Sequence, residues 1–151
     1  MLGRTASGLF WMMRYLERFE NTARLIDAGF RMSLTRARTA RSEWESVLTT
    51  AGTRDLYLEQ NDGFSTRKVV DFSVTNRETP SSIFNSIAAA RENARMTRTA
   101  LTRDVWEAIN ETYLQCKHDF AAESHRSDLP DFLTQIRQQA ALVRGTINST
   151  M

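Results

Sequence analysis

Arginine and glutamate side chains spaced about one helical turn apart are the residues of this sequence best suited to chemistry. Arg14, Glu17, Asn21 and Arg24 recur at steps of three and four residues, which places them on one face of a helix. Glu20 precedes Arg24 by four residues, an order that favours an ion pair along the helix. The spacing therefore predicts a polar stripe on the first helix.

The same residue types recur in a later segment. The first copy contains Arg18, Glu20, Asn21 and Arg24, and the second contains Arg91, Glu92, Asn93 and Arg95. Two interpretations stay open. In the first, the two stripes form an ion-pair network that clamps the first helix to the helix beginning near Pro80. In the second, they line a groove where Arg24 and Arg95 bind a carboxylate or phosphate of a ligand or partner. The carboxylates that would hold these guanidiniums in place are Glu17, Glu20 and Glu92.

Other catalytic or metal-binding patterns are weak. Cys116 falls in an apolar helical seam without an activating base, so we expect a core cysteine rather than a nucleophile. His118 and His125 are seven residues apart, but His118 points away from Cys116, which favours surface histidines and no metal site. The chain lacks a glycine-rich phosphate loop and a Glu-x-x-His motif, so no cofactor is expected.

The cations divide into 18 arginines and 2 lysines, which nearly cancel the 18 acids to leave a net charge of +2. Four arginines form a run without an intervening acid: Arg31, Arg36, Arg38 and Arg41. Such a run suits the phosphates of a nucleic acid, but it also suits the solvated C-terminal end of a helix. Arginine is a planar cation that proteins also use for fixed ion pairs. The excess of arginine over lysine is therefore compatible with ion pairs between helices and with the binding of a ligand.

Apolar periodicity predicts the helices that position these residues. A first helix of about thirty residues is expected, with Thr5 or Ser7 as N-cap and an end past Ser33. Its predicted seam is Leu9, Met12, Leu16, Phe19, Ala23, Ile26 and Phe30. Three further long helices have the seams Ile83, Ile87, Ala90, Ala94 and Leu101; Trp106, Ile109, Tyr113, Cys116 and Phe120; and Leu133, Ile136, Ala140, Val143 and Ile147.

The sequence predicts the helix boundaries and the middle of the chain from local signals rather than from long periodic patterns. Thr79 is predicted to cap a helix with Pro80 at its first position, and Thr102 to cap the next one. A shorter helix around Trp44, Val47 and Leu48 is expected to begin after Ser42. Between residues 52 and 78, Asn61-Asp62-Gly63 signals a turn. Val70, Phe72 and Val74 alternate like a strand, but an isolated strand would have no partner, so a helix is predicted.

Together these patterns predict an all-α helical bundle of about four long amphipathic helices plus one or two short ones. At 151 residues, the chain is expected to be a single domain covering 1–151. The apolar stretch Leu9–Met13 is too short to span a membrane or to form a secretory signal. One cysteine excludes an internal disulfide, so a soluble cytoplasmic protein is expected.

Several motifs in combination resemble the bacterial Alpha-E family over essentially the whole chain. They are Met1-Leu2-Gly3-Arg4-Thr5-Ala6, Phe10-Trp11, Arg14-Tyr15-Leu16-Glu17-Arg18, Glu20-Asn21-Thr22-Ala23-Arg24-Leu25, Thr79-Pro80-Ser81-Ser82-Ile83, Ala90-Arg91-Glu92-Asn93-Ala94-Arg95 and Trp106-Glu107. Two features depart from the pattern. Met13 stands where the family often has a small residue, and Ser7 and Gly8 stand near a usual acid or amide.

The resemblance implies an all-helical protein encoded beside, or fused to, an ATP-grasp ligase-like protein and a transglutaminase-like protein. These two proteins are the expected partners, and a homodimer is possible because family members usually run about twice this length. The chain looks like the N-terminal half of such a member. We therefore expect a non-catalytic accessory or scaffold module of a peptide or amide-bond modification system. The alternatives are an amide-forming or amide-cleaving enzyme that uses the Glu/Arg/Asn face, and a nucleic-acid-binding bundle that uses Arg31–Arg41.

Overall fold

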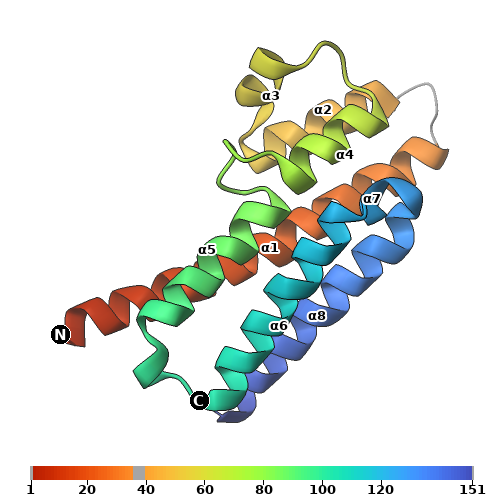
Figure 1. Ribbon diagram of the computed structural model, residues 1–151. Helices are drawn as coiled ribbons and strands as arrows, with labels where there is room; N and C mark the ends of the chain where they lie inside the picture. The colour runs from red at the N-terminus through yellow and green to blue at the C-terminus, as the bar shows by residue number, and fades with distance from the viewer. Residues whose placement is uncertain (1, 36–39, 151) are drawn as a thin grey trace.

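One long helix, α1 (Leu2–Thr35), runs the length of the molecule, and the other helices pack against it (Figure 1). The computed structural model describes residues 2–35 and 40–150. Helix α5 (Ile83–Met96) lies beside α1, while α6 (Arg103–Ala121) and α8 (Leu129–Thr150) form a second layer. Successive helices run in opposite directions, so these four make an up-down-up-down bundle. The prediction of an all-α bundle with four long helices is confirmed.

Three short helices lie between α1 and α5 in the chain and cover the C-terminal half of α1 (Figure 1). They are α2 (Ala40–Ala51), α3 (Arg54–Gln60) and α4 (Thr66–Thr75). Helix α7 (Ser124–Ser127) and the 3₁₀ turn η2 (Arg98–Ala100) are connectors. Between residues 52 and 78 the chain forms α3 and α4, so the segment with Val70, Phe72 and Val74 is helical, as predicted. Gly63, between these helices, is in the left-handed region that the predicted turn requires. The described ranges thus hold more short helices than the one or two expected.

The predicted seams meet in two apolar clusters that share α1. The larger cluster surrounds Phe19, Ile26 and Trp44, and the smaller one surrounds Met12 and Ile109. The predicted seam residues of α5 up to Ala94 and all those of α8 are buried. Leu16 packs against both clusters, so a single helix joins the two parts of the core. No helix in the described ranges is long and apolar enough to cross a bilayer.

Several predicted helix starts are wrong, although the helices themselves form. Helix α1 begins at Leu2, so Thr5 and Ser7 lie inside it, and Ser42 lies inside α2. At α5, the hydroxyl of Ser82 accepts a hydrogen bond from the backbone amide of Asn85. Ser82 is therefore the N-cap, and the helix begins three residues after Pro80. Thr102 caps α6 as predicted, through the amide of Val105. Cap prediction fails here because several short polar residues stand close together.

Small residues let α1 approach its neighbours closely. A Cβ added at Gly8 would lie 2.2 Å from Cγ2 of Thr97, the residue that ends α5. A Cβ added at Gly29 would lie 2.8 Å from both Trp44 Cζ3 and Val47 Cγ2 of α2. Trp44 is fully buried and donates from its indole nitrogen to Thr66 Oγ1 at 2.9 Å. The ring cannot move aside without breaking this bond.

We therefore expect Gly29→Ala to lower the melting temperature. Its overpacking cost of about 1–3 kcal/mol exceeds the helix-propensity gain of about 1 kcal/mol. Gly145→Ala in α8 is the matched control, because no atom of the described residues lies within 4 Å of its added Cβ. That control should stabilise the protein by about 0.5–1 kcal/mol. Thermal unfolding followed by circular dichroism measures both, and equal shifts in the same direction would contradict the close approach.

Candidate functional site

The two predicted polar stripes lie at different levels of the bundle because α5 runs antiparallel to α1. Thr22 Oγ1 donates to the carbonyl of Ser81 at 2.8 Å, which places Arg24 near the start of α5. At the other end, Thr97 lies against Gly8, which places Arg95 near the N-terminal part of α1. At 1.5 Å per residue, Arg24 and Arg95 are therefore about 20 Å apart along the helix axis. They cannot bind one anion together, so that expectation is wrong.

The ion pairs of the stripes also differ from the predicted network. Arg14 pairs with Glu17 at 3.0 Å, and Arg95 pairs with Glu92 at 2.5 Å, each within its own helix and exposed. The hydrogen bond and charge of Arg95 lower the pKa of Glu92. Among the described residues, no ion pair joins α1 to α5. The predicted clamp between these two helices is thus absent from the described ranges.

A ladder of charges instead joins α1 to α8. Glu20 binds both Arg24 of its own helix and Arg144 of α8. One heptad further along α1, Asp27 binds Arg31 at 3.3 Å and Arg137 of α8 at 3.4 Å. The acids sit between the helices, since the Glu20 and Asp27 side chains are only 12% and 18% exposed. Each half-buried acid is shared by two arginines, an arrangement that favours arginine over lysine.

Removal of the Glu20 charge should destabilise the fold more than removal of an exposed one. Glu20→Gln leaves two guanidiniums facing a neutral amide, and we expect a loss of about 1–2 kcal/mol in unfolding free energy. Glu17→Gln, which breaks only the exposed pair with Arg14, should cost no more than about 0.5 kcal/mol. Urea unfolding of both variants, together with a double-mutant cycle on Glu20 and Arg144, measures the difference. A coupling energy near zero would contradict the ladder.

The second stripe serves the packing of α5 on α6. Arg91 Nε donates to Asn110 Oδ1 at 2.8 Å, and its guanidinium lies 4.7 Å from the ring centroid of Tyr113. Trp106 lies between Arg91 and Arg98, at 5.9 and 5.1 Å. Asn93 donates to the carbonyl of Ala89 in its own helix. These contacts stabilise the interface through cation–π interactions and hydrogen bonds.

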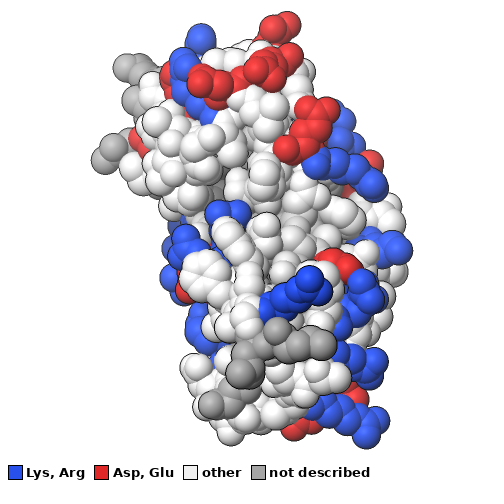
Figure 2. Space-filling model, turned by 90° about the vertical axis from the view of Figure 1, so that its left-hand side faces the viewer, with Lys and Arg blue, Asp and Glu red and all other residues white. Residues whose placement is uncertain are grey.

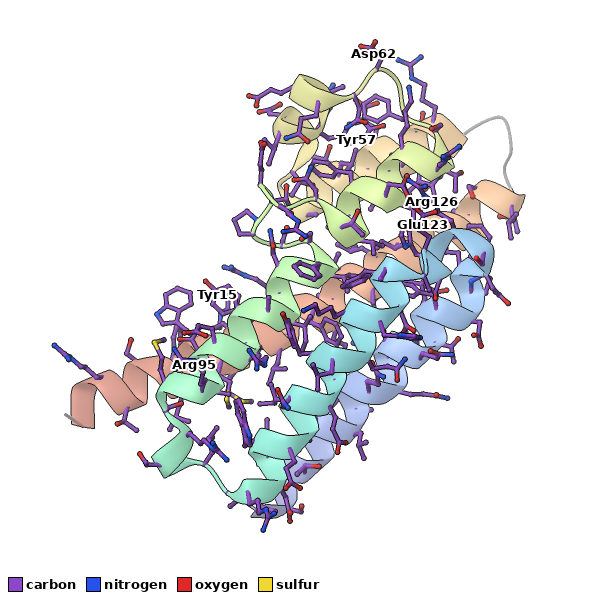
Figure 3. All side chains as sticks on the ribbon, in the orientation of Figure 1. Tyr15, Tyr57, Asp62, Arg95, Glu123 and Arg126 are labelled. Carbon is purple, nitrogen blue, oxygen red and sulfur yellow. The ribbon has the colours of Figure 1, made fainter. Side chains whose placement is uncertain are left out.

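The outward side of α1 carries three aromatic rings in a row, here named the aromatic strip: Phe10, Trp11 and Tyr15. Phe10 and Trp11 are 56% and 41% exposed. The rings of Phe10 and Trp11 are 5.3 Å apart, those of Trp11 and Tyr15 are 5.9 Å apart, and Arg18 lies 5.4 Å from the Tyr15 centroid. Figure 3 shows Tyr15 projecting from α1 on the side away from α6 and α8. Arg18, a residue of the first copy of the motif, thus lies at the end of the strip.

Beyond Arg18, the strip leads into a groove of about 490 Å³ where α1, the end of α2 and the turn before α5 meet. The groove is lined by Arg18, Asn21, Thr22, Arg24, Leu25, Thr50, Ala51 and Ser81. Figure 2 shows the face at the N-terminal end of α1, where uncharged side chains fill the middle and acids gather mainly at the upper end, over α2–α4. Three of the predicted site residues therefore share one groove.

A cluster of Asp71, His125 and Arg126 joins α4 to α7 and was not expected from the sequence. Arg126 donates to both carboxylate oxygens of Asp71, at 3.0 and 2.8 Å, and also pairs with Glu123 at 3.2 Å (Figure 3). His125 Nε2 lies 3.0 Å from Asp71 Oδ1, while its Nδ1 is buried and has no hydrogen-bond partner among the described residues. The His125 side chain is only 3% exposed, so the prediction of a surface histidine is wrong at this position.

Two pKa values in this cluster are lowered, for different physical reasons. Burial lowers the pKa of His125, and the attraction of Asp71 only partly offsets this effect. Burial acts to raise the pKa of Asp71, but the hydrogen bonds and charges of Arg126 and His125 outweigh it, so the pKa is lowered. Asp71 is therefore ionised and His125 neutral near pH 7. The cluster acts as a clamp between α4 and α7.

Acid should weaken this clamp. Because the folded pKa of His125 lies below its unfolded value of about 6.5, its contribution to stability is complete above that pH and is lost as the pH falls. The slope is at most about 1.4 kcal/mol per pH unit for one proton. Asp71, whose pKa is also lowered, adds a further loss at still lower pH. Melting temperatures between pH 7 and 5 should therefore fall less steeply in His125→Gln than in the wild type, with the exposed His118→Gln as control.

The remaining candidate residues are separate from these sites. Cys116 is fully buried in the larger core cluster. Burial raises the pKa of its thiol, and the negative charge of Asp119 raises it further. No group of three potential metal ligands occurs in the part of the chain that the structure describes. In the basic run, Arg31 pairs with Asp27 and Arg41 lies 5.7 Å from the ring of Phe64. Arg36 and Arg38 lie outside the described residues.

Comparison with known families gives one match. The model of the Alpha-E family, described as a predicted alpha-helical domain with a conserved ER motif, matches residues 1–151. Glu17-Arg18 is the Glu-Arg dipeptide of this sequence, and its arginine stands between the aromatic strip and the groove. No curated protein and no solved structure matches the chain.

Proposed function

This chain belongs to the Alpha-E family, and from that premise we propose that it is a non-catalytic accessory module that docks an ATP-grasp ligase-like partner. The partner acts in peptide or amide-bond modification, as the family resemblance implies. The docking surface is the aromatic strip on α1. Transglutaminase-like proteins are the second class of partner, and they would be bound by the assembled complex.

The exposure of the aromatic strip is the observation that carries this proposal. Aromatic rings contribute large apolar areas, and Trp, Tyr and Arg are enriched among the residues that dominate binding energy at protein interfaces. Phe10, Trp11, Tyr15 and Arg18 combine these types in one contiguous row on a rigid helix. The opposite side of α1 is occupied by the core and the charge ladder, so the row is free to receive a partner.

The Glu/Arg pairs themselves support a structural role better than a catalytic one. Glu20 and Asp27 are used to hold α8, and Arg91 is used to hold α6. The copies of the motif are separated along the bundle rather than gathered around one substrate. Arg18, which has no acidic partner among the residues that the structure describes, adjoins the aromatic strip.

Truncation of two rings of the strip should weaken capture of the partner without loss of the fold. We expect Trp11→Ala combined with Tyr15→Ala to weaken binding to the ATP-grasp ligase-like protein of the same genome by about tenfold or more. Leu142→Ala is the matched control, because Leu142 is an exposed apolar residue of α8, 67% accessible. The measurement is biolayer interferometry with the tagged full chain, and melting temperatures check that both variants fold.

Two results would contradict the proposal. One is a wild-type chain that fails to bind either class of partner. The other is a concentration-dependent homodimer in light scattering that Trp11→Ala and Tyr15→Ala disrupt, because a second copy of the chain would then be the occupant of the strip.

A further inference from the structure

The groove next to the aromatic strip has an unbalanced positive charge. Its lining, within the described ranges, includes two arginines, Arg18 and Arg24, and no aspartate or glutamate. The groove also offers a small apolar floor, through Leu25 and Ala51. Thr22 fixes one wall, since its hydroxyl donates to the carbonyl of Ser81 in the turn before α5. The groove is therefore a formed feature that three separate segments hold in place.

The two arginines differ in their partners. Arg24 is bound to Glu20, whose other oxygen holds Arg144, so its charge is largely compensated. Arg18 has no ion pair and no hydrogen-bond acceptor within the described ranges, and its contact is the face of Tyr15. Asn21, one turn further along α1, is exposed and likewise makes no side-chain hydrogen bond in the described part of the chain. Unused donors thus come from two adjacent positions of one helix face.

From this arrangement we infer that the groove binds a single carboxylate of an acidic peptide segment. The guanidinium of Arg18 donates two parallel hydrogen bonds to the carboxylate, and the side-chain amide of Asn21 donates a third. An apolar residue that neighbours the carboxylate packs on Tyr15 and Trp11. This inference rests on the proposed function, because it names the chemistry that the partner presents beside the aromatic strip.

The charge distribution favours a peptide over a nucleic acid. A nucleic acid carries a phosphate at every nucleotide and needs a row of unpaired cations. In the described ranges this groove offers one arginine free of acids, which matches one carboxylate. The acids gathered over α2–α4 would repel a long polyanion from the upper end of the same face (Figure 2). A short acidic segment avoids this repulsion.

Nitrogen-15 NMR of the full chain tests the inference with defined probes. The peptide acetyl-Phe-Gly-Glu-amide supplies a side-chain carboxylate, acetyl-Phe-Gly-Gly with a free C-terminus supplies a terminal one, and acetyl-Phe-Gly-Gln-amide is the neutral control. We expect saturable shifts of the Arg18 Nε–H and Asn21 side-chain signals with both acids. The neutral peptide should bind about tenfold more weakly, since hydrogen bonds to charged groups are the stronger ones.

Two variants complete the test. Arg18→Gln should abolish the shifts of the Asn21 signals, whereas Arg103→Gln, an exposed arginine of α6 that pairs with Glu107, should leave them unchanged. The inference is overturned if the acidic peptides cause no saturable shift, if the neutral peptide binds equally well, or if Arg18→Gln retains binding. It is also overturned if inorganic phosphate or a single-stranded oligonucleotide binds as tightly as the acidic peptides.

Failure of this inference can be told apart from failure of the proposed function. If the peptides do not bind but Trp11 and Tyr15 are still required for capture of the ligase-like protein, only the carboxylate site is wrong. If the peptides bind at Arg18 but that protein is never captured, the carboxylate site stands and the proposed partner is wrong.

Discussion

The close antiparallel packing of α5 on α1 is the constraint on which the rest of the structure depends. Gly8 lets α1 approach the end of α5 closely, and the hydroxyl of Thr22 donates a hydrogen bond to the carbonyl of Ser81 in the turn before α5. Because α1 is one continuous helix, it carries both apolar clusters and sets the level of each residue on α5. This register separates Arg24 from Arg95 and prevents the two copies of the motif from forming one site.

The charged residues of α1 have different roles on the two sides of the helix. Glu20 and Asp27 face α8 and each meets two arginines, so the charges removed from water are paired. An isolated buried charge would be far more costly. On the outward side, Arg18 lies beside the aromatic strip and forms no ion pair within residues 2–35 and 40–150. The same run of polar residues thus stabilises the bundle on one side and adjoins the proposed docking surface on the other.

Periodicity in the sequence was sufficient to predict the four long helices and most of the buried side chains, because each helix buries a single stripe. The ion pairs Glu20–Arg24 and Glu92–Arg95 were also predictable, since their partners are one turn apart. The start of α5 was not, because three neighbouring residues could each have served as the cap.

The features that the sequence did not predict depend on contacts between segments that are far apart in the chain. The Asp71 and His125 side chains meet only after α4 packs on α7, and nothing in their spacing indicates a pair. The ladder between α1 and α8 has a weak signal in the sequence. Its two acids are seven residues apart, and so are its two arginines. This spacing predicts the ion pairs only when the two helices are known to be antiparallel neighbours.

The central claim is that the outward side of α1 receives a partner while its inner side holds the bundle together. Hydroxyl-radical footprinting of the chain alone and in complex with the ATP-grasp ligase-like protein tests it most directly. The account predicts that oxidation of Phe10, Trp11 and Tyr15 falls on complex formation, while that of Leu114 and Leu142, which are exposed on α6 and α8, stays the same. Protection of Leu114 and Leu142 with unchanged oxidation of the aromatic strip would contradict it.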